Sequence, residues 1–168
     1  MDTTTPRIRF SHFLEQFPQL ELPITLGEDT VRRISKETPP LPARMIEQFI
    51  LPLEPTQIND EFTEFIACLQ LPDADDYVGL VYWRADLAQY HYTLVTLNPK
   101  TEELIDRVIL AGTSYDGEEL IQTTAAITEG LMIYQVSGQG RGKEFDYQAS
   151  GSTARRFQLA ASGKIIEL

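Results

Sequence analysis

The sequence predicts a mainly β (or α+β) fold: an antiparallel meander of about eight strands, with one or two short N-terminal helices. Three observations support this. Segments with period-two or wholly apolar character fill residues 61–168. Nine of the ten glycines lie at or after Gly79, between these segments, whereas eight of the ten prolines lie at or before Pro55. The connections between segments are too short for parallel crossovers, so neighbouring strands are expected to be antiparallel.

Eight segments fit the strand pattern. Their expected ranges are 63–71, 78–84, 89–97, 103–111, 118–128, 131–137, 154–161 and 164–168. Turn-forming pairs separate several of them, including Asp116-Gly117, a pair that tolerates the positive φ angles of a tight hairpin turn. Eight strands are enough to form a curved sheet, a barrel or a two-layer sandwich, and the pattern favours none of the three.

The whole chain, residues 1–168, is predicted to form one domain. Its length and its 42% hydrophobic content are typical of a single globular domain with its own core. Residues 1–60 are rich in proline, and no linker separates them from residues 61–168. We call residues 1–60 the N-terminal clasp, and we expect it to carry short helices and to wrap onto the sheet formed by residues 61–168.

Two helical segments are expected in the clasp. Phe13 and Phe17 lie four residues apart and fit a brief helical turn that ends at Pro18. A second helix is expected between Pro42 and Pro52, because its apolar residues recur at the spacing of one helix face. This second helix is predicted to pack on the sheet.

The charge distribution bears on possible partners. The net charge of −11 argues against nucleic acid, because binding a phosphate backbone requires clustered Lys and Arg. Residues 45–83 contain eight acidic side chains and no Lys or Arg. This acidic 45–83 region is predicted to attract a basic protein partner; the alternative is a solvated surface that keeps the protein soluble.

The sequence predicts a cytoplasmic protein that does not associate with a membrane. The first six residues lack a basic region followed by an apolar stretch, and no later apolar run is long enough to span a bilayer. The single cysteine, Cys68, lies in an alternating apolar segment, where a buried and inert thiol is expected.

No metal, cofactor or catalytic residue is predicted. A zinc site requires three or four converging ligands, and the chain has only His12, His91 and Cys68 as nitrogen and sulfur ligands. The carboxylates of 73–76 do not follow the pattern of an EF-hand loop.

Aromatic residues supply the candidate ligand-binding site, which comprises Tyr82, Tyr90, His91 and Tyr92. Strand alternation places Tyr90 and Tyr92 on one face of their strand and His91 on the other. Tyrosines on an open face would stack a sugar, a base or a peptide, whereas tyrosines on a covered face are core residues.

The predicted function is a non-catalytic protein-interaction or ligand-binding role. Two alternatives remain open from the sequence. One is a small hydrolase-like enzyme that uses Asp75 or Asp76 with His91, which requires these ionisable groups to converge in a pocket. The other is a carrier that holds an apolar ligand inside a closed barrel.

A series of short motifs runs along nearly the whole chain: Phe13-Leu14-Glu15-Gln16-Phe17-Pro18, Leu22-Pro23-Ile24-Thr25-Leu26, a helix ending in Phe49-Ile50, the strand at 90–97, and Ile109 with Ala111-Gly112. Together these motifs resemble a group of uncharacterised bacterial proteins. The resemblance implies a shared β-rich fold with an N-terminal clasp, and it carries no catalytic residue over to this chain.

Overall fold

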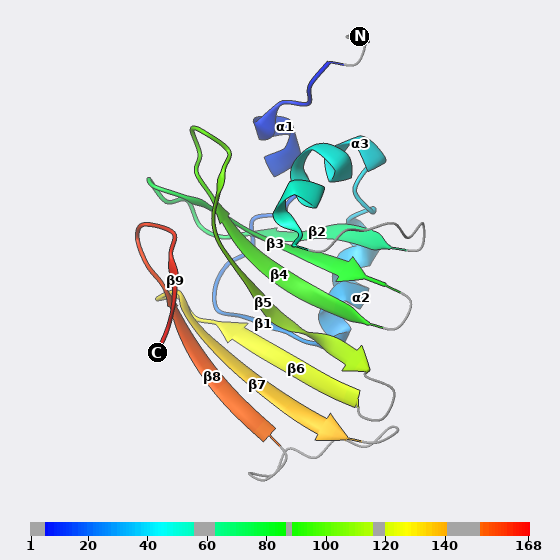
Figure 1. The fold of residues 1–168 in the computed structure, drawn as a ribbon, viewed down its shortest axis with the longest axis vertical. Helices are drawn as coiled ribbons and strands as arrows, with labels where there is room; N and C mark the ends of the chain where they lie inside the picture. The colour runs from blue at the N-terminus through cyan, green and yellow to red at the C-terminus, as the bar shows by residue number, and fades with distance from the viewer. Residues whose placement is uncertain (1–5, 56–62, 87–88, 116–119, 141–151) are drawn as a thin grey trace.

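One antiparallel sheet dominates the structure, a computed structural model that describes residues 6–55, 63–86, 89–115, 120–140 and 152–168 (Figure 1). The sheet order is β2-β3-β4-β5-β6-β7-β8-β9, and β1 pairs with β6. The strands are β1 (Ile24–Leu26), β2 (Glu64–Gln70), β3 (Val78–Ala85), β4 (Tyr90–Leu97), β5 (Leu104–Tyr115), β6 (Leu120–Ile127), β7 (Met132–Gly140), β8 (Ser152–Leu159) and β9 (Ile165–Glu167). The predicted mainly β meander is confirmed, because consecutive strands from β2 to β9 are antiparallel neighbours.

Each of the eight expected segments overlaps one of the strands β2 to β9. The largest difference is in β5, which was expected to end at residue 111 and continues to Tyr115. Gly112 lies inside this strand and does not form a turn, so the hairpin between β5 and β6 begins later than predicted. The predicted turn at Asp116-Gly117 lies outside the described residues.

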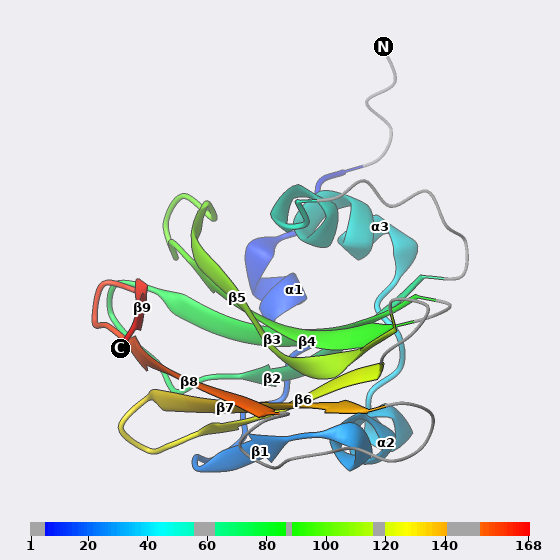
Figure 2. The ribbon, with the colours of Figure 1, turned by 60° about the horizontal axis from the view of Figure 1, so that its bottom comes forward.

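The sheet divides at β5. This strand pairs with β4 from Leu104 to Thr113, but it pairs with β6 only between Gly112 and Tyr115. Beyond Thr123, β6 is paired with β1 instead, through Leu26, Thr25 and Ile24. We call the point where β6 leaves β5 the fork. Strands β2 to β5 lie in one layer and strands β6 to β9, with β1, in the other (Figure 2). Across the described strands the sheet is bent into two layers and does not close into a barrel.

Gly112 permits the close approach of β5 and β4 at the fork. Its φ angle is 152°, and an added Cβ would lie 2.3 Å from the carbonyl oxygen of Tyr90 and 2.7 Å from Cα of His91. Any other residue would collide with the β4 backbone here. Glycine is therefore required for β5 and β4 to approach this closely.

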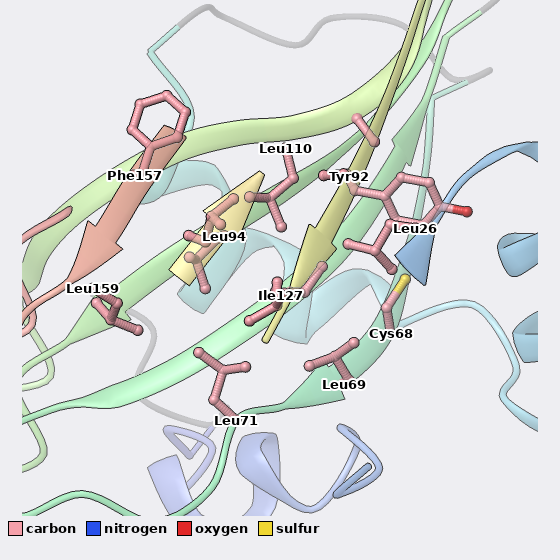
Figure 3. Packing of buried hydrophobic residues seen from close by; sticks show 14 of the residues in the cluster. Leu26, Cys68, Leu69, Leu71, Tyr92, Leu94, Leu110, Ile127, Phe157 and Leu159 are labelled. Carbon is pink, nitrogen blue, oxygen red and sulfur yellow. The ribbon is translucent and has the colours of Figure 1, made fainter. Parts of the chain in front are cut away.

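The main core fills the space between the two layers (Figure 3). Tyr92 and Leu94 of β4 point into it, as the predicted alternation requires, and Ile127 and Phe157 face them from the second layer. Cys68 is fully buried there, as predicted, and burial raises the pKa of its thiol, which keeps the sulfur protonated and unreactive.

A second core lies between the opposite face of β2–β4 and the clasp. It is covered by α1 (Phe10–Leu14) and by three consecutive turns, which are α3 (Ala43–Met45), a π-helical turn (Ile46–Ile50) and a 3-10 turn (Leu51–Leu53). The ring centroids of Phe13 and Phe49 stack 4.4 Å apart. Both helical segments expected in the clasp are therefore present, and their apolar residues pack on the sheet.

The sequence did not predict β1 or α2 (Glu28–Glu37). β1 has only three residues, too few to show an alternating pattern, and α2 is mostly polar. Gly27 separates them: its N–H donates to Thr30 Oγ1 at 3.0 Å, and the Thr30 hydroxyl donates to the Thr25 carbonyl at 3.2 Å. No helix in the described part of the chain is long and apolar enough to cross a membrane.

Candidate functional site

The four residues predicted to bind a ligand lie in two different environments. Tyr82 and Tyr92 are buried, and both hydroxyls have partners inside the protein. The Tyr82 hydroxyl donates to Glu54 Oε1 at 3.0 Å, and the Tyr92 hydroxyl donates to the Gly27 carbonyl at 3.0 Å. Tyr90 and His91 are only half-buried, and both line a cleft. The structure therefore brings two of the four predicted residues into one site and places the other two in the interior.

The cleft lies beside the fork and has a volume of about 390 Å³. Its walls come from β4, β5, β6, β7 and β8, together with Gln89 just before β4. The described residues that line it are Gln89, Tyr90, His91, Ile109, Ala111, Gly112, Thr113, Ser114, Ile121, Thr123, Gln135, Ser137 and Arg155. Most of them carry hydroxyl, amide or other hydrogen-bonding side chains, and the surface of the cleft is about equally polar and apolar.

Side-chain hydrogen bonds fix the floor of the cleft. Gln135 is buried, and its Nε2 donates to the carbonyls of Ile109 at 2.8 Å and Leu110 at 2.7 Å. Both carbonyls belong to β5, next to the fork, where β6 no longer pairs with that strand. The hydroxyls of Thr123 and Ser137 lie 2.8 Å apart and share a hydrogen bond. The cleft is thus preformed by contacts within the protein.

The His91 imidazole lies on the face of β4 covered by the clasp, the same face as Arg84, its cross-strand partner. Its Nε2 is buried and has no hydrogen-bond partner among the described residues. Burial lowers the pKa of His91, Glu54 and Asp86 oppose this effect, and Arg84 and Arg107 reinforce it. The imidazole is therefore neutral near pH 7. A buried polar atom without a hydrogen-bond partner lowers the stability of the fold.

A group of buried charges lies beside His91, on the face of the sheet covered by the clasp. Glu54, only 1% exposed at its side chain, accepts hydrogen bonds from the Tyr82 hydroxyl, from Arg84 Nη1 at 3.3 Å and from Arg107 Nη2 at 3.0 Å. Arg84 Nε also donates to Asp86 Oδ2 at 3.1 Å. We call these five residues the Glu54 cluster. Its two guanidinium groups and two carboxylates give the cluster a formal charge of zero.

Sequence reasoning missed the Glu54 cluster. Glu54 was counted as one of eight acidic residues of the 45–83 region, which was expected to form an acidic face. Its partners lie 28, 30 and 53 positions away along the chain. The one available signal was alternation: Arg84 is two residues from buried Tyr82 on the same strand, so both side chains point toward the clasp.

The remaining acidic residues of the 45–83 region do not share one element, and Glu47 lies in the π-helical turn of the clasp. Glu64 lies at the start of β2, and exposed Asp73, Asp75 and Asp76 follow its end. Asp60 and Glu61 lie outside the described residues. Binding of a basic partner to this region stays a prediction.

The hydrolase alternative required Asp75 or Asp76 to meet His91. Both aspartates lie in the turn before β3, next to Val78, which pairs with Leu97 of β4, whereas His91 pairs with Arg84. These two positions of β4 are six residues apart, which corresponds to about 20 Å along a strand. The structure therefore does not bring these three residues into one site. Among the described residues, no group of three or more His, Cys, Asp or Glu is placed to hold a metal ion.

Comparison with known proteins does not extend this description: no protein-family model matches the chain, and neither a curated protein nor a solved structure is significantly similar to it. The resemblance to uncharacterised bacterial proteins accordingly stays a prediction.

Proposed function

We propose that this protein is a non-catalytic binding domain that holds a small polar molecule in the cleft beside the fork. The observation that carries the proposal is a preformed cleft of about 390 Å³ whose hydrogen-bonding groups, buried Gln135 and the hydroxyls of Thr123 and Ser137, are fixed by contacts within the protein. Small-molecule sites in proteins have volumes of roughly 300–1,000 Å³ and a few fixed polar groups that orient the ligand. Tyr90 adds an aromatic surface to the wall, which suits a flat or cyclic ligand.

The charges around His91 favour binding over catalysis. A histidine that acts as a general base is oriented by a carboxylate and lies close to a nucleophile. Two carboxylates, those of Glu54 and Asp86, act to raise the pKa of His91. Both form ion pairs with arginines of the Glu54 cluster. These ion pairs hold the strands together and leave His91 as a neutral hydrogen-bonding group.

An apolar ligand in the interior is not supported. The sheet is open in its described strands, and the space between its layers is filled by buried side chains of both layers (Figure 3). A carrier would need an empty apolar cavity of the size of its ligand.

The proposal is tested by amide NMR of the full chain during titration with monosaccharides, nucleosides and hydroxy acids. At least one class is expected to shift the amide signals of cleft residues on β5, β6 and β7. A matched pair of variants locates the binding. Ser137→Leu fills the cleft, whereas Val136→Leu adds one methylene group at the next position of β7, on the opposite, exposed face.

Ser137→Leu is expected to abolish the shifts, and Val136→Leu is expected to preserve them. The proposal fails if none of the compounds perturbs the cleft, or if both variants respond as the unmodified protein does. Melting curves of both variants establish that they are folded.

A further inference from the structure

The charge of the cleft differs from the charge of the whole protein. The chain carries 25 acidic and 14 basic residues, for a net charge of −11. Yet none of the thirteen described residues that line the cleft is Asp or Glu, and one of them, Arg155, is a permanent cation. This lining provides hydrogen-bond donors and one guanidinium group, that of Arg155, inside an otherwise acidic molecule. Such a site attracts anions.

Arg155 is well placed to hold an anionic group. It lies on β8 directly opposite Gln135 of β7, so both side chains leave the sheet on the same face, which is the face of the cleft. Its guanidinium carbon lies 5.1 Å from the centroid of the Phe157 ring, and this contact supports the planar group from one side. The aromatic support orients the guanidinium without removing its hydrogen-bond donors.

The Arg155 guanidinium already binds one carboxylate of the protein, that of Glu167. Nε and Nη2 of Arg155 donate to the two oxygens of Glu167, at 2.9 Å and 2.6 Å, in the bidentate geometry typical of carboxylate and phosphate recognition. Both side chains are about half exposed, at 53% and 49%. An exposed ion pair of this kind contributes little to stability, so a ligand anion in the cleft competes with Glu167 at small cost.

We infer that the ligand of the cleft carries a carboxylate or phosphate, which binds the Arg155 guanidinium in place of Glu167 while the rest of the molecule lies against Tyr90 and the hydroxyls of β5 to β7. This inference rests on the proposed function and narrows the ligand class from small polar molecules to small anions. Arg155 is then the residue that determines specificity, and Glu167 is an internal competitor for it.

Matched probes separate the charge from the rest of the ligand. Glucose and glucose 6-phosphate differ by one phosphate, and benzamide and benzoate differ by one carboxylate. Each probe is titrated into the full chain at a constant ionic strength of about 0.15 M, and dissociation constants are read from the cleft amide signals. The anionic member of at least one pair is expected to bind at least about tenfold more tightly, as a bidentate charged contact implies. The pair that shows the difference identifies the anion as phosphate or carboxylate.

Three variants test the role of Arg155. Arg155→Gln is expected to remove the preference for the anionic probe. Arg156→Gln is the control, because it removes the same charge at the next position of β8, whose side chain points to the opposite face. It should retain the preference. Glu167→Gln is expected to strengthen anion binding severalfold, because it weakens the competitor and leaves Arg155 in place.

Each outcome decides the inference. If anionic and neutral probes bind the cleft equally, the inference is wrong and the proposed function stands. If Arg155→Gln and Arg156→Gln weaken anion binding equally, the effect is one of net charge and the inference is also wrong. If no probe perturbs the cleft signals, both the inference and the proposed function fail.

Discussion

Glu54 shows how much a single residue depends on its surroundings. A carboxylate that is almost fully buried is unfavourable unless charged or hydrogen-bonding partners surround it. Glu54 has three such partners, and these come from β3 and β5. The contacts join the end of the 3-10 turn in the clasp to two strands of the first layer, so one side chain links segments that are distant in sequence.

Replacing Glu54 by Gln is expected to lower the free energy of unfolding by about 3 kcal/mol, as for other broken buried ion pairs. Arg107 would lose its carboxylate partner, whereas Arg84 would keep Asp86. Urea denaturation measures the change. Glu64→Gln, an exposed change in the same acidic region, should alter the stability by less than about 0.5 kcal/mol. Equal effects of the two substitutions would show that the Glu54 cluster contributes no stability.

His91 predicts a pH dependence of stability. Burial holds its pKa in the folded state below the ordinary histidine value of about 6.5. As the pH falls through 6.5, the unfolded chain therefore binds a proton before the folded chain does, and stability decreases. Urea denaturation between pH 7.5 and pH 5.5 should show this decrease, and the His91→Gln variant should show a smaller one. Parallel pH profiles of the two proteins would contradict this prediction.

β5 is the element that organises the fold. It is twelve residues long, pairs with β4 of the first layer and with β6 of the second, and supplies the carbonyls that Gln135 binds at the cleft. The alternating pattern predicted its first part. The second part was not predicted, because a glycine between apolar segments usually marks a turn. Whether a glycine ends a strand or bends it depends on the neighbouring backbone, which in this case belongs to β4.

Replacing Gly112 by Ala is expected to destabilise the protein by about 3 kcal/mol or more, because the new methyl group would collide with the β4 backbone at a strained φ angle. Thermal unfolding measures the effect. Gly130→Ala is the matched control: the nearest atom to its added Cβ is Thr128 Oγ1, 4.0 Å away. The control should unfold close to the temperature of the unmodified protein. A stable Gly112→Ala variant would show that β5 does not approach β4 as closely as described.

At the scale of the whole molecule, local signals predicted far more than long-range ones. Strand positions and antiparallel order followed from alternation and short turns, which depend on neighbouring residues. The pairing of β1 with β6, the Glu54 cluster and the cleft all depend on contacts between residues far apart in the chain. For the same reason, only two of the four predicted site residues, Tyr90 and His91, line the cleft. Arg155 also lines it and was not predicted.

The two cores indicate that the fold does not depend on a metal ion. Buried apolar side chains fill both sides of the first layer, and this burial is the main source of stability. The melting temperature is therefore expected to be the same with and without excess EDTA. A clear decrease in EDTA would instead point to the carboxylates of the 73–76 turn as a cation site.

The pairing of β1 with β6 has a consequence for the order of folding during synthesis. Leu26 pairs with Ala125, so the two partners are separated by 99 positions (26 to 125). At the usual rate of roughly 5–20 residues per second, β1 leaves the ribosome about 5–20 s before its partner. Pairs of such high contact order form slowly because a long loop must close first. Strands β2 to β5 can associate in that interval through local hairpins. β1 is thus synthesised before its partner β6, and it is among the last strands to pair.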